Sequence, residues 1–437
     1  MASANFLNEP GINLYLQLFQ VPVTDVSTVK RKWVYYQSAA NPIVFVIKPL
    51  SDYIDVNKKE LRLVVKTTKR NGKDLEEGKK YTSINNAPYS IIKQFTVKIN
   101  ETLLTEQSAG IQAYNAYFKT LLNYTDQAKK WYLTNALNYK DAGGHMDEVD
   151  KTADRNMGLK KRGSFTNTSG EVGMFAVPLC DLSNIDKLLL DNLEIMIKID
   201  LNIDDFVLMS GEADNDSTLQ IVSSTLRVQA VRVSDSTKLD PTNIMTGQKA
   251  RPAIYTLTRT PTHARIIASG VLAHTETDLF NGLIPQCIMI RMVRNDAYNG
   301  HLPRNPFKFQ LFDLNALRVI SSGEELPYSC LDLTGGKMID GSNTLFLGSG
   351  DMNCGHGIDI VREDWEKGYA LFRLDTTPAA SGHPNHSIPH RSGNINLYFQ
   401  FANPSRTVLN LIVYAEFHNL LKIDRNRRVA YDLSQGA

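Results

Sequence analysis

The stretch Gly110–Asp141, GIQAYNAYFKTLLNYTDQAKKWYLTNALNYKD, carries the clearest helical pattern in the 437-residue chain. Its first part has apolar residues at the spacing of one helical face, at Ile111, Tyr114, Phe118 and Leu121. A second run follows Thr125, a good N-cap, with an apolar stripe of Ala128, Tyr132, Leu133, Ala136 and Leu137. We expect this helical insert to bury its apolar face on a sheet, because the sequence around it has the pattern of strands.

The flanking sequence alternates apolar and polar residues over short segments, as half-buried strands do. The clearest examples are Leu193–Leu201, Ile395–Phe401 and Leu409–Phe417. Further strands are expected at Ile254–Arg259, Ala264–Ala268, Ile288–Val293 and Phe307–Phe312, with a turn at Asn299-Gly300, a helical turn at Arg362–Trp365 and a long polar loop at Gly143–Gly170. Alternation favours antiparallel sheets, and this many short strands predicts two β-sandwiches of about 200 residues each. We place the boundary at Ser234–Gln248, which contains Asp240-Pro241 and a short helical pattern.

The overall charge is close to neutral, with 48 basic and 46 acidic residues and a net charge of +2. No global field would therefore draw the chain onto nucleic acid or a membrane. Three local basic clusters occur, at Lys30–Lys32, Lys160–Arg162 and Arg425–Arg428. We interpret them as solvated faces or partners in salt bridges, with contact to packaged nucleic acid as the alternative.

The cysteines and the apolar runs restrict the environment of the chain. Four cysteines lie far apart without a CxxC pair, which suits a reducing compartment. The first residues lack the basic and apolar regions of a secretion signal, and no window of about 18 apolar residues predicts a transmembrane segment.

Motifs for catalysis are scarce. The run around Gly348-Ser349-Gly350 lacks the final residues of a phosphate-binding loop. By residue type a metal site is conceivable from Cys354, His356, His383, His386 and His390. The last three belong to the polar segment HPNHSIPH, however, which is typical of a loop tip. We therefore expect no enzyme activity and no catalytic, cofactor or metal residues.

Aromatic residues gather in the helical insert. A stacking platform for single-stranded nucleic acid would pair such rings with a basic groove, and few lysines accompany them here. Packing and subunit contact are the better interpretation. We expect Phe118 to pack on the sheet, so that Phe118→Asp lowers soluble yield. Tyr117 and Trp131 are the candidates for a subunit interface, where substitution would block assembly and leave the monomer folded.

Several stretches together resemble one protein family, the major capsid proteins of Polinton/Maverick elements and the related adintoviruses. They are Ala113–Tyr124 (AYNAYFKTLLNY), Tyr139–Gly143 (YKDAG), Asp52–Asp55 (DYID), Val293–Gly300 (VRNDAYNG), Asn305–Asn315 (NPFKFQLFDLN), Arg362–Leu374 (REDWEKGYALFRL) and Val413–Arg427 (VYAEFHNLLKIDRNR). They occur in the family's order and span most of the chain. Gly170–Asn192 fits loosely, and His383–Ser392 is a private loop.

The resemblance implies a mainly β, hexon-like double jelly-roll: two antiparallel jelly-roll sandwiches side by side, with short helical inserts in loops. Residues 1–29 would form an N-terminal arm, 30–235 the first jelly-roll with the insert 110–140, and 236–437 the second. The chain would assemble as pseudo-hexameric homotrimers that tile an icosahedral shell, with virion localisation and assembly inside the host cell. Its partners would be itself, neighbouring capsomers, and penton and minor capsid proteins, without specific nucleic acid.

Two other functions remain open at this stage. A penton or minor capsid protein normally carries one jelly-roll, whereas this chain has strand patterns for two. A carbohydrate-binding attachment protein of jelly-roll fold would need a shallow pocket in which aromatic and acidic groups converge.

Overall fold

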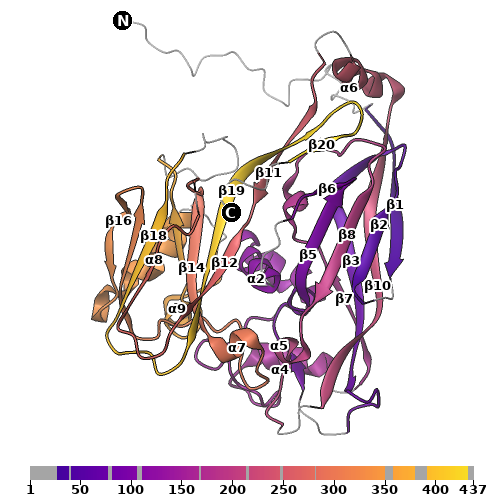
Figure 1. Cartoon of the computed structure of the whole chain (residues 1–437). Helices are drawn as coiled ribbons and strands as arrows, with labels where there is room; N and C mark the ends of the chain where they lie inside the picture. The colour runs from indigo at the N-terminus through magenta and orange to yellow at the C-terminus, as the bar shows by residue number, and fades with distance from the viewer. Residues whose placement is uncertain are drawn as a thin grey trace, which may run out of the picture.

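The computed structural model describes residues 27–38, 41–76, 81–105, 111–166, 169–212, 216–246, 250–280, 282–349, 358–378 and 391–431. Two groups of strands lie side by side, one built from the first half of the chain and one from the second, with the helix α2 between them (Figure 1). All the strand pairs in the described sheets are antiparallel, as the alternation predicted.

The first half forms two four-stranded sheets that face each other. Its main strands are β1 (Thr28–Ser38), β2 (Ile43–Ile47), β3 (Tyr53–Lys69), β5 (Ile92–Ile99), β6 (Thr102–Leu103), β7 (Glu171–Ala176), β8 (Ile195–Leu201) and β10 (Ser217–Val233). One sheet has the order β1-β10-β3-β7 and the other the order β2-β8-β5-β6. A short pair, β4 (Thr82–Ser83) and β9 (Leu208–Met209), lies apart from both.

The second half repeats this plan. Its strands are β11 (Ala253–Arg259), β12 (Thr262–Ile267), β13 (Ala273–Glu276), β14 (Cys287–Arg294), β15 (Leu314–Ser321), β16 (Glu324–Asp332), β17 (Phe372–Asp375), β18 (Ile395–Phe401), β19 (Leu409–Ile423) and β20 (Val429–Ala430). One sheet has the order β11-β19-β14-β17, and β12 and β20 also pair with β19. The other sheet has the order β13-β18-β15-β16.

Both halves therefore have the same topology. Numbered along the chain, with β11 and β12 taken as one interrupted strand, the eight main strands of each half are ordered 1-8-3-6 in one sheet and 2-7-4-5 in the other. Each sheet thus alternates strands from the two ends of its half. This is the arrangement of an eight-stranded double-sheet jelly-roll.

The helices lie in the connections between strands. They are α1 (Ala87–Ser90), α2 (Gln112–Asn123), α3 (Asp126–Lys130), α4 (Met157–Phe165), α5 (Asp204–Val207), α6 (Asp235–Thr246), α7 (Asn295–Asn299), α8 (Met338–Ser349) and α9 (Arg362–Glu366). A 3-10 helix, η2, covers Tyr132–Ala136, and two others cover Asp181–Asn184 (η3) and Gly335–Lys337 (η4). Within the described ranges, no helix is long and apolar enough to cross a bilayer.

The predicted insert is helical and joins β6 to β7. Its predicted apolar face, Ile111, Tyr114, Phe118 and Leu121, is buried. Thr125 caps α3, because its hydroxyl accepts a hydrogen bond from the Ala128 amide. The second run is not one helix, since α3 stops at Lys130 and η2 follows. Tyr132 of the expected stripe is consequently exposed.

Two other local predictions were wrong. Phe307–Phe312 is not a strand, because within it only Phe309 forms a bridge, with Tyr369, and the rings of Phe307 and Phe309 pack against α2. The polar stretch Gly143–Gly170 contains the helix α4, and α8 was not anticipated. The turn predicted at Asn299-Gly300 lies at the end of the short helix α7, with Gly300 at φ 92°.

Candidate functional site: the junction between the two halves

Aromatic rings from both halves meet on α2. The Tyr117 ring stacks on Phe307 of the second half, with ring centroids 4.1 Å apart and an interplanar angle of 3°. Tyr114 stacks on Tyr298, with centroids 5.8 Å apart. Phe118 packs against Phe309 at 5.5 Å. The helix belongs to the first half by sequence, yet its apolar face is completed by the second.

This placement corrects the expectation for Tyr117. Its side chain is only 1% exposed, because Phe307 covers it within the same chain. Tyr117 therefore has no surface to offer to a neighbouring subunit, and its substitution should destabilise the monomer. Phe118 is buried as expected, although its partners come from the second half as well as from the first.

A buried arginine of the second half lies against the same helix. The Arg291 guanidinium carbon is 3.2 Å from the centroid of the Phe118 ring, which is a close cation–π contact. None of the three guanidinium nitrogens has a hydrogen-bond partner within the described structure. Burial holds the pKa of Arg291 well below its usual value. The aromatic rings are thus the main compensation for a charge removed from water.

A buried ion pair at the end of the insert forms a second connection between the halves. Asp141 and Arg162 are both fully buried, and their side chains are 2.7 Å apart. The other carboxylate oxygen of Asp141 accepts a hydrogen bond from the Asn305 amide of the second half, at 3.1 Å. The Tyr369 hydroxyl donates to the Asp141 carbonyl at 2.8 Å. Each carboxylate oxygen therefore has a partner, and the partners come from both halves.

Further ion pairs surround this connection. Asp147 binds Lys308 at 2.7 Å and Arg304 at 3.2 Å, both from the second half. Lys140 binds Asp364 of α9 at 2.6 Å. The segment 140–147 is therefore fixed to the second half by hydrogen bonds and charges, next to the aromatic cluster on α2.

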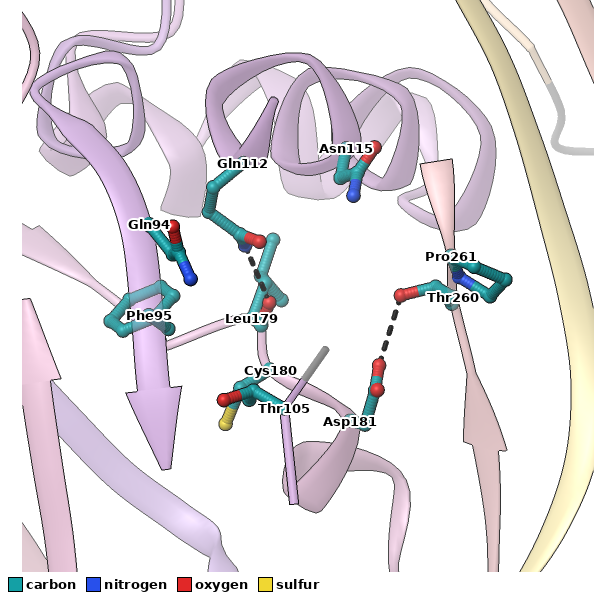
Figure 2. Close-up of a pocket in the computed structure, with 10 residues that line it drawn as sticks. All are labelled: Gln94, Phe95, Thr105, Gln112, Asn115, Leu179, Cys180, Asp181, Thr260 and Pro261. Carbon is teal, nitrogen blue, oxygen red and sulfur yellow. Dashed lines mark hydrogen bonds between the residues drawn. The ribbon is translucent and has the colours of Figure 1, made fainter. Parts of the chain in front are cut away.

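A small polar pocket lies at the other end of α2, between β5, η3 and the turn that joins β11 to β12 (Figure 2). It is lined by Gln94, Phe95, Thr105, Gln112, Asn115, Leu179, Cys180, Asp181, Thr260 and Pro261. Gln112 donates to the Leu179 carbonyl at 2.8 Å, and Thr260 donates to Asp181 at 2.9 Å. The cavity volume of about 30 Å³ fits one or two water molecules and no larger substrate.

The pocket does not have the geometry of an active site. Burial raises the pKa of the Asp181 carboxyl, and the positive charge of Lys119 opposes that shift. The Cys180 thiol lies 3.5 Å from the Ser183 hydroxyl. In the part of the chain that the structure describes, no three His, Cys, Asp or Glu side chains gather as metal ligands do. Cys354, His356, His383, His386 and His390 lie outside the described residues.

The basic clusters take part in ion pairs within the chain. Arg31 of β1 pairs with Asp55, near the start of β3, and Lys32 pairs with Asp52, directly before β3. Arg162 pairs with Asp141, and Arg427 pairs with Asp191. These contacts favour the interpretation as salt-bridge partners over a nucleic-acid surface.

Trp131, the other candidate interface residue, is the most exposed large apolar side chain of the described residues, at 74%. It lies between α3 and η2, where the helical path of the insert breaks. The structure therefore separates the two candidates: Tyr117 faces the interior and Trp131 faces solvent.

Sequence reasoning missed Arg291 and the Asp141–Arg162 pair. Arg291 stands inside an apolar strand, CIMIRMVR, and a lone charge in such a run was a signal that its side chain is buried. Asp141 and Arg162 are 21 residues apart and carry no motif. Only the fold brings them together.

Comparison with known proteins finds similarity at the level of the whole chain. No family model matches. An uncharacterised protein of Caenorhabditis elegans is 23% identical over 365 residues, covering 80% of this chain and 82% of that protein.

Solved structures extend this likeness. A chain in the cryo-EM structure of the Sputnik virophage is similar with a TM-score of 0.65 and 12% identity, covering 99% of this chain and 94% of that chain. The Faustovirus major capsid protein has a TM-score of 0.58 and 8% identity, covering 94% of this chain and 93% of its own. The mavirus major capsid protein has a TM-score of 0.50 and 12% identity, covering 98% and 97%.

These likenesses extend over both sandwiches rather than one. Together with the repeated strand order, they confirm the predicted fold class. The chain has a double jelly-roll fold, mainly β, with its helices in the connections between strands.

Proposed function

We propose that this protein is a major capsid protein, which acts by shape and self-association and not as an enzyme. One observation carries the proposal: the same eight-stranded jelly-roll occurs twice in one chain, and the whole chain matches viral capsid proteins of that architecture. The alternative of a penton or minor protein with one jelly-roll does not account for the second sandwich. The sequence resemblance narrows the proposal to capsid proteins of Polinton-like elements and adintoviruses.

The proposed assembly is a homotrimer with a pseudo-hexameric outline that tiles an icosahedral shell. Three chains with two similar sandwiches each would present six similar units around one axis, and rotational symmetry would close the contacts. Penton and minor capsid proteins would complete the shell, and the protein would be localised in the virion after assembly inside the host cell.

We also propose the division into an arm at 1–29, a first jelly-roll at 30–235 and a second at 236–437. The membership of the strands in the sheets supports this division. The last described strand in the sheets of the first half ends at Val233, and the first described strand in the sheets of the second half begins at Ala253. The helix α6, Asp235–Thr246, lies between them. The arm lies mostly outside the described residues, and β1 already begins at Thr28.

The junction described above suits this role. A shell subunit must keep the two sandwiches in a fixed relative position, since every neighbour contact depends on it. The aromatic cluster on α2 and the buried Asp141–Arg162 pair supply connections of that kind.

The decisive experiment measures assembly of the purified protein. Light scattering coupled to size-exclusion chromatography gives the mass in solution, and negative-stain electron microscopy shows the particle shape. We expect trimers of about three times the chain mass, 49.0 kDa, and shells at higher concentration. A protein that stays monomeric and binds glycans saturably on an array would instead be a carbohydrate-binding attachment protein.

A further inference from the structure

An apolar groove lies on the second half, between α8 and α9. It is lined by Ile339, Ser342, Asn343, Phe346, Ile360, Val361, Arg362 and Trp365, with a cavity volume of about 140 Å³. Ile339 and Val361 are exposed at its mouth, and Leu347 on α8 is exposed close by in sequence. Grouped apolar side chains in a concave surface are unusual on a protein that has no partner.

The groove presents few polar groups that a ligand would have to satisfy. The Trp365 indole, which is buried at its base, donates its N–H to the Leu371 carbonyl at 2.9 Å. The Ser342 hydroxyl donates to the Ile339 carbonyl at 2.8 Å. An apolar ring entering the groove would therefore not leave these donors unpaired.

Trp131 on the first half has the properties of a side chain that fills such a groove. Its ring is exposed, yet its indole N–H already donates to the Gln127 side chain at 3.0 Å, one helical turn earlier. The Thr134 hydroxyl donates to the Trp131 carbonyl at 2.6 Å. The ring is thus held in a defined position, and its burial would cost neither an unpaired donor nor much side-chain entropy.

The charges next to the ring and the groove are complementary. Lys129 and Lys130 form the last turn of α3, directly before Trp131, and Lys130 is exposed. The helix α9, one wall of the groove, carries exposed Glu363 and Glu366. Arg362 and Lys367, directly after the helix, are exposed basic residues of the same wall, and the Arg362 guanidinium lies 3.8 Å from Glu366. Glu363 is therefore the acidic side chain that Lys130 would approach in the contact.

We propose that Trp131 of one copy inserts into the α8–α9 groove of a second copy of this chain. The contact joins the first half of one subunit to the second half of the next, so it is heterologous and closes when rotational symmetry completes a ring. This inference rests on the proposed capsid function and names one contact of the proposed trimer.

Photo-crosslinking tests the contact directly. Trp131 is replaced by the photo-reactive p-benzoylphenylalanine in the full-length chain, and equal amounts of isotopically heavy and light protein are mixed before illumination. Mass spectrometry should find mixed heavy–light crosslinks from position 131 to residues 338–349 or 358–366. Crosslinks between copies at other segments, crosslinks within one chain only, or no crosslink in an assembled sample would overturn the proposal.

Two substitutions give an independent measurement. Trp131→Ala should weaken assembly at least about 30-fold, as expected when a central aromatic anchor of an interface is lost. Val361→Asp in the groove should weaken it comparably, while the matched control Val29→Asp, on the exposed face of β1, should not. Unfolding temperatures of the monomers should stay at the wild-type value, since both side chains are exposed.

The outcomes separate this inference from the capsid proposal. A wild-type protein that never assembles contradicts the capsid function itself. A wild-type protein that forms trimers or shells, together with Trp131→Ala and Val361→Asp variants that assemble as well as it does, contradicts only the contact between Trp131 and the groove.

Discussion

At the scale of single residues, Asp141 and Arg162 form a fully buried ion pair that links the insert to the second half. Both side chains are fully removed from water, and every oxygen of the Asp141 carboxylate has a described partner. Such a pair contributes little net stability while it is complete, because desolvation offsets the attraction. Removing one partner strongly lowers the stability of the protein, because the other charge then stays buried and unpaired.

We expect Asp141→Asn to lower the free energy of unfolding by about 3–5 kcal/mol, because Arg162 would keep its charge without a counter-ion. Denaturant unfolding followed by circular dichroism measures this loss. The matched control is Asp154→Asn, which breaks the exposed pair of Asp154 and Lys160 and should unfold like the wild type. Equal stabilities for the two variants would contradict the role assigned to Asp141.

Asp181 makes stability depend on pH in a defined direction. Burial raises the pKa of its carboxyl in the folded state above the ordinary value of 3.8, with Lys119 opposing the shift. A raised folded pKa means that the folded protein binds the proton more tightly than the unfolded chain does. Its favourable contribution is therefore complete below about pH 3.8 and is lost as the pH rises through the folded pKa.

The variant Asp181→Asn should accordingly be more stable than the wild type at pH 7. Its amide oxygen still accepts the hydrogen bond from Thr260, and it has no charge to desolvate. The difference in unfolding temperature should shrink as the pH is lowered from 7 towards 4. A variant that is less stable than the wild type at pH 7 would mean that attraction to Lys119 and Arg259 exceeds the desolvation cost.

At the scale of elements, α2 shows what a sequence pattern can and cannot reveal. The 3.6-residue period identified its buried face, and Ile111, Tyr114, Phe118 and Leu121 are all buried. The period does not tell which surface covers that face. The sheet of the first half was the simplest expectation, and Phe307, Phe309 and Arg291 of the second half cover much of it instead.

The structure also changes the best test of this helix. Phe118→Asp would place a carboxylate beside the unpaired Arg291 guanidinium, so a new ion pair could mask the cost of the lost ring. Phe118→Ala avoids that complication and should lower the free energy of unfolding by about 3–5 kcal/mol. Chemical denaturation measures the loss. The exposed Tyr132→Ala, in the same insert, is the control and should change stability little.

The strands at the junction do not alternate between buried and exposed residues, because both of their faces are covered. β8 and β18 alternate buried and partly buried residues, as predicted. In β14 and the first part of β19 nearly every residue is buried, on both faces. One face packs on the opposite sheet, and α2 and its aromatic partners cover the other. Alternation predicts that Ile412 and Tyr414 face outward. Both are buried, because this second layer covers them.

At the scale of the whole molecule, local periodicity predicted most strands and the division into two similar halves. It could not give the pairing order, because strands that pair, such as β1 and β10, are nearly 200 residues apart. The sequence did not predict the junction between the halves either, since Asp141, Asn305 and Tyr369 come from distant segments without a shared motif. Trp131 was recognised as an interface candidate from its residue type, but its proposed groove, made by α8 and α9, was not.

The junction implies that the two halves depend on each other for folding. A fragment of residues 1–235 would leave the α2 rings Tyr114, Tyr117 and Phe118 without their partners, and a fragment of 236–437 would expose Phe307 and Arg291. We therefore expect each fragment alone to be insoluble, and the two co-expressed fragments to form a soluble one-to-one complex. Exposed aromatic surface of that extent favours aggregation. Solubility and co-purification through a tag on one fragment measure this. Fragments that fold separately, with cooperative melting of their own, would show that the junction joins two independent domains instead of completing one core.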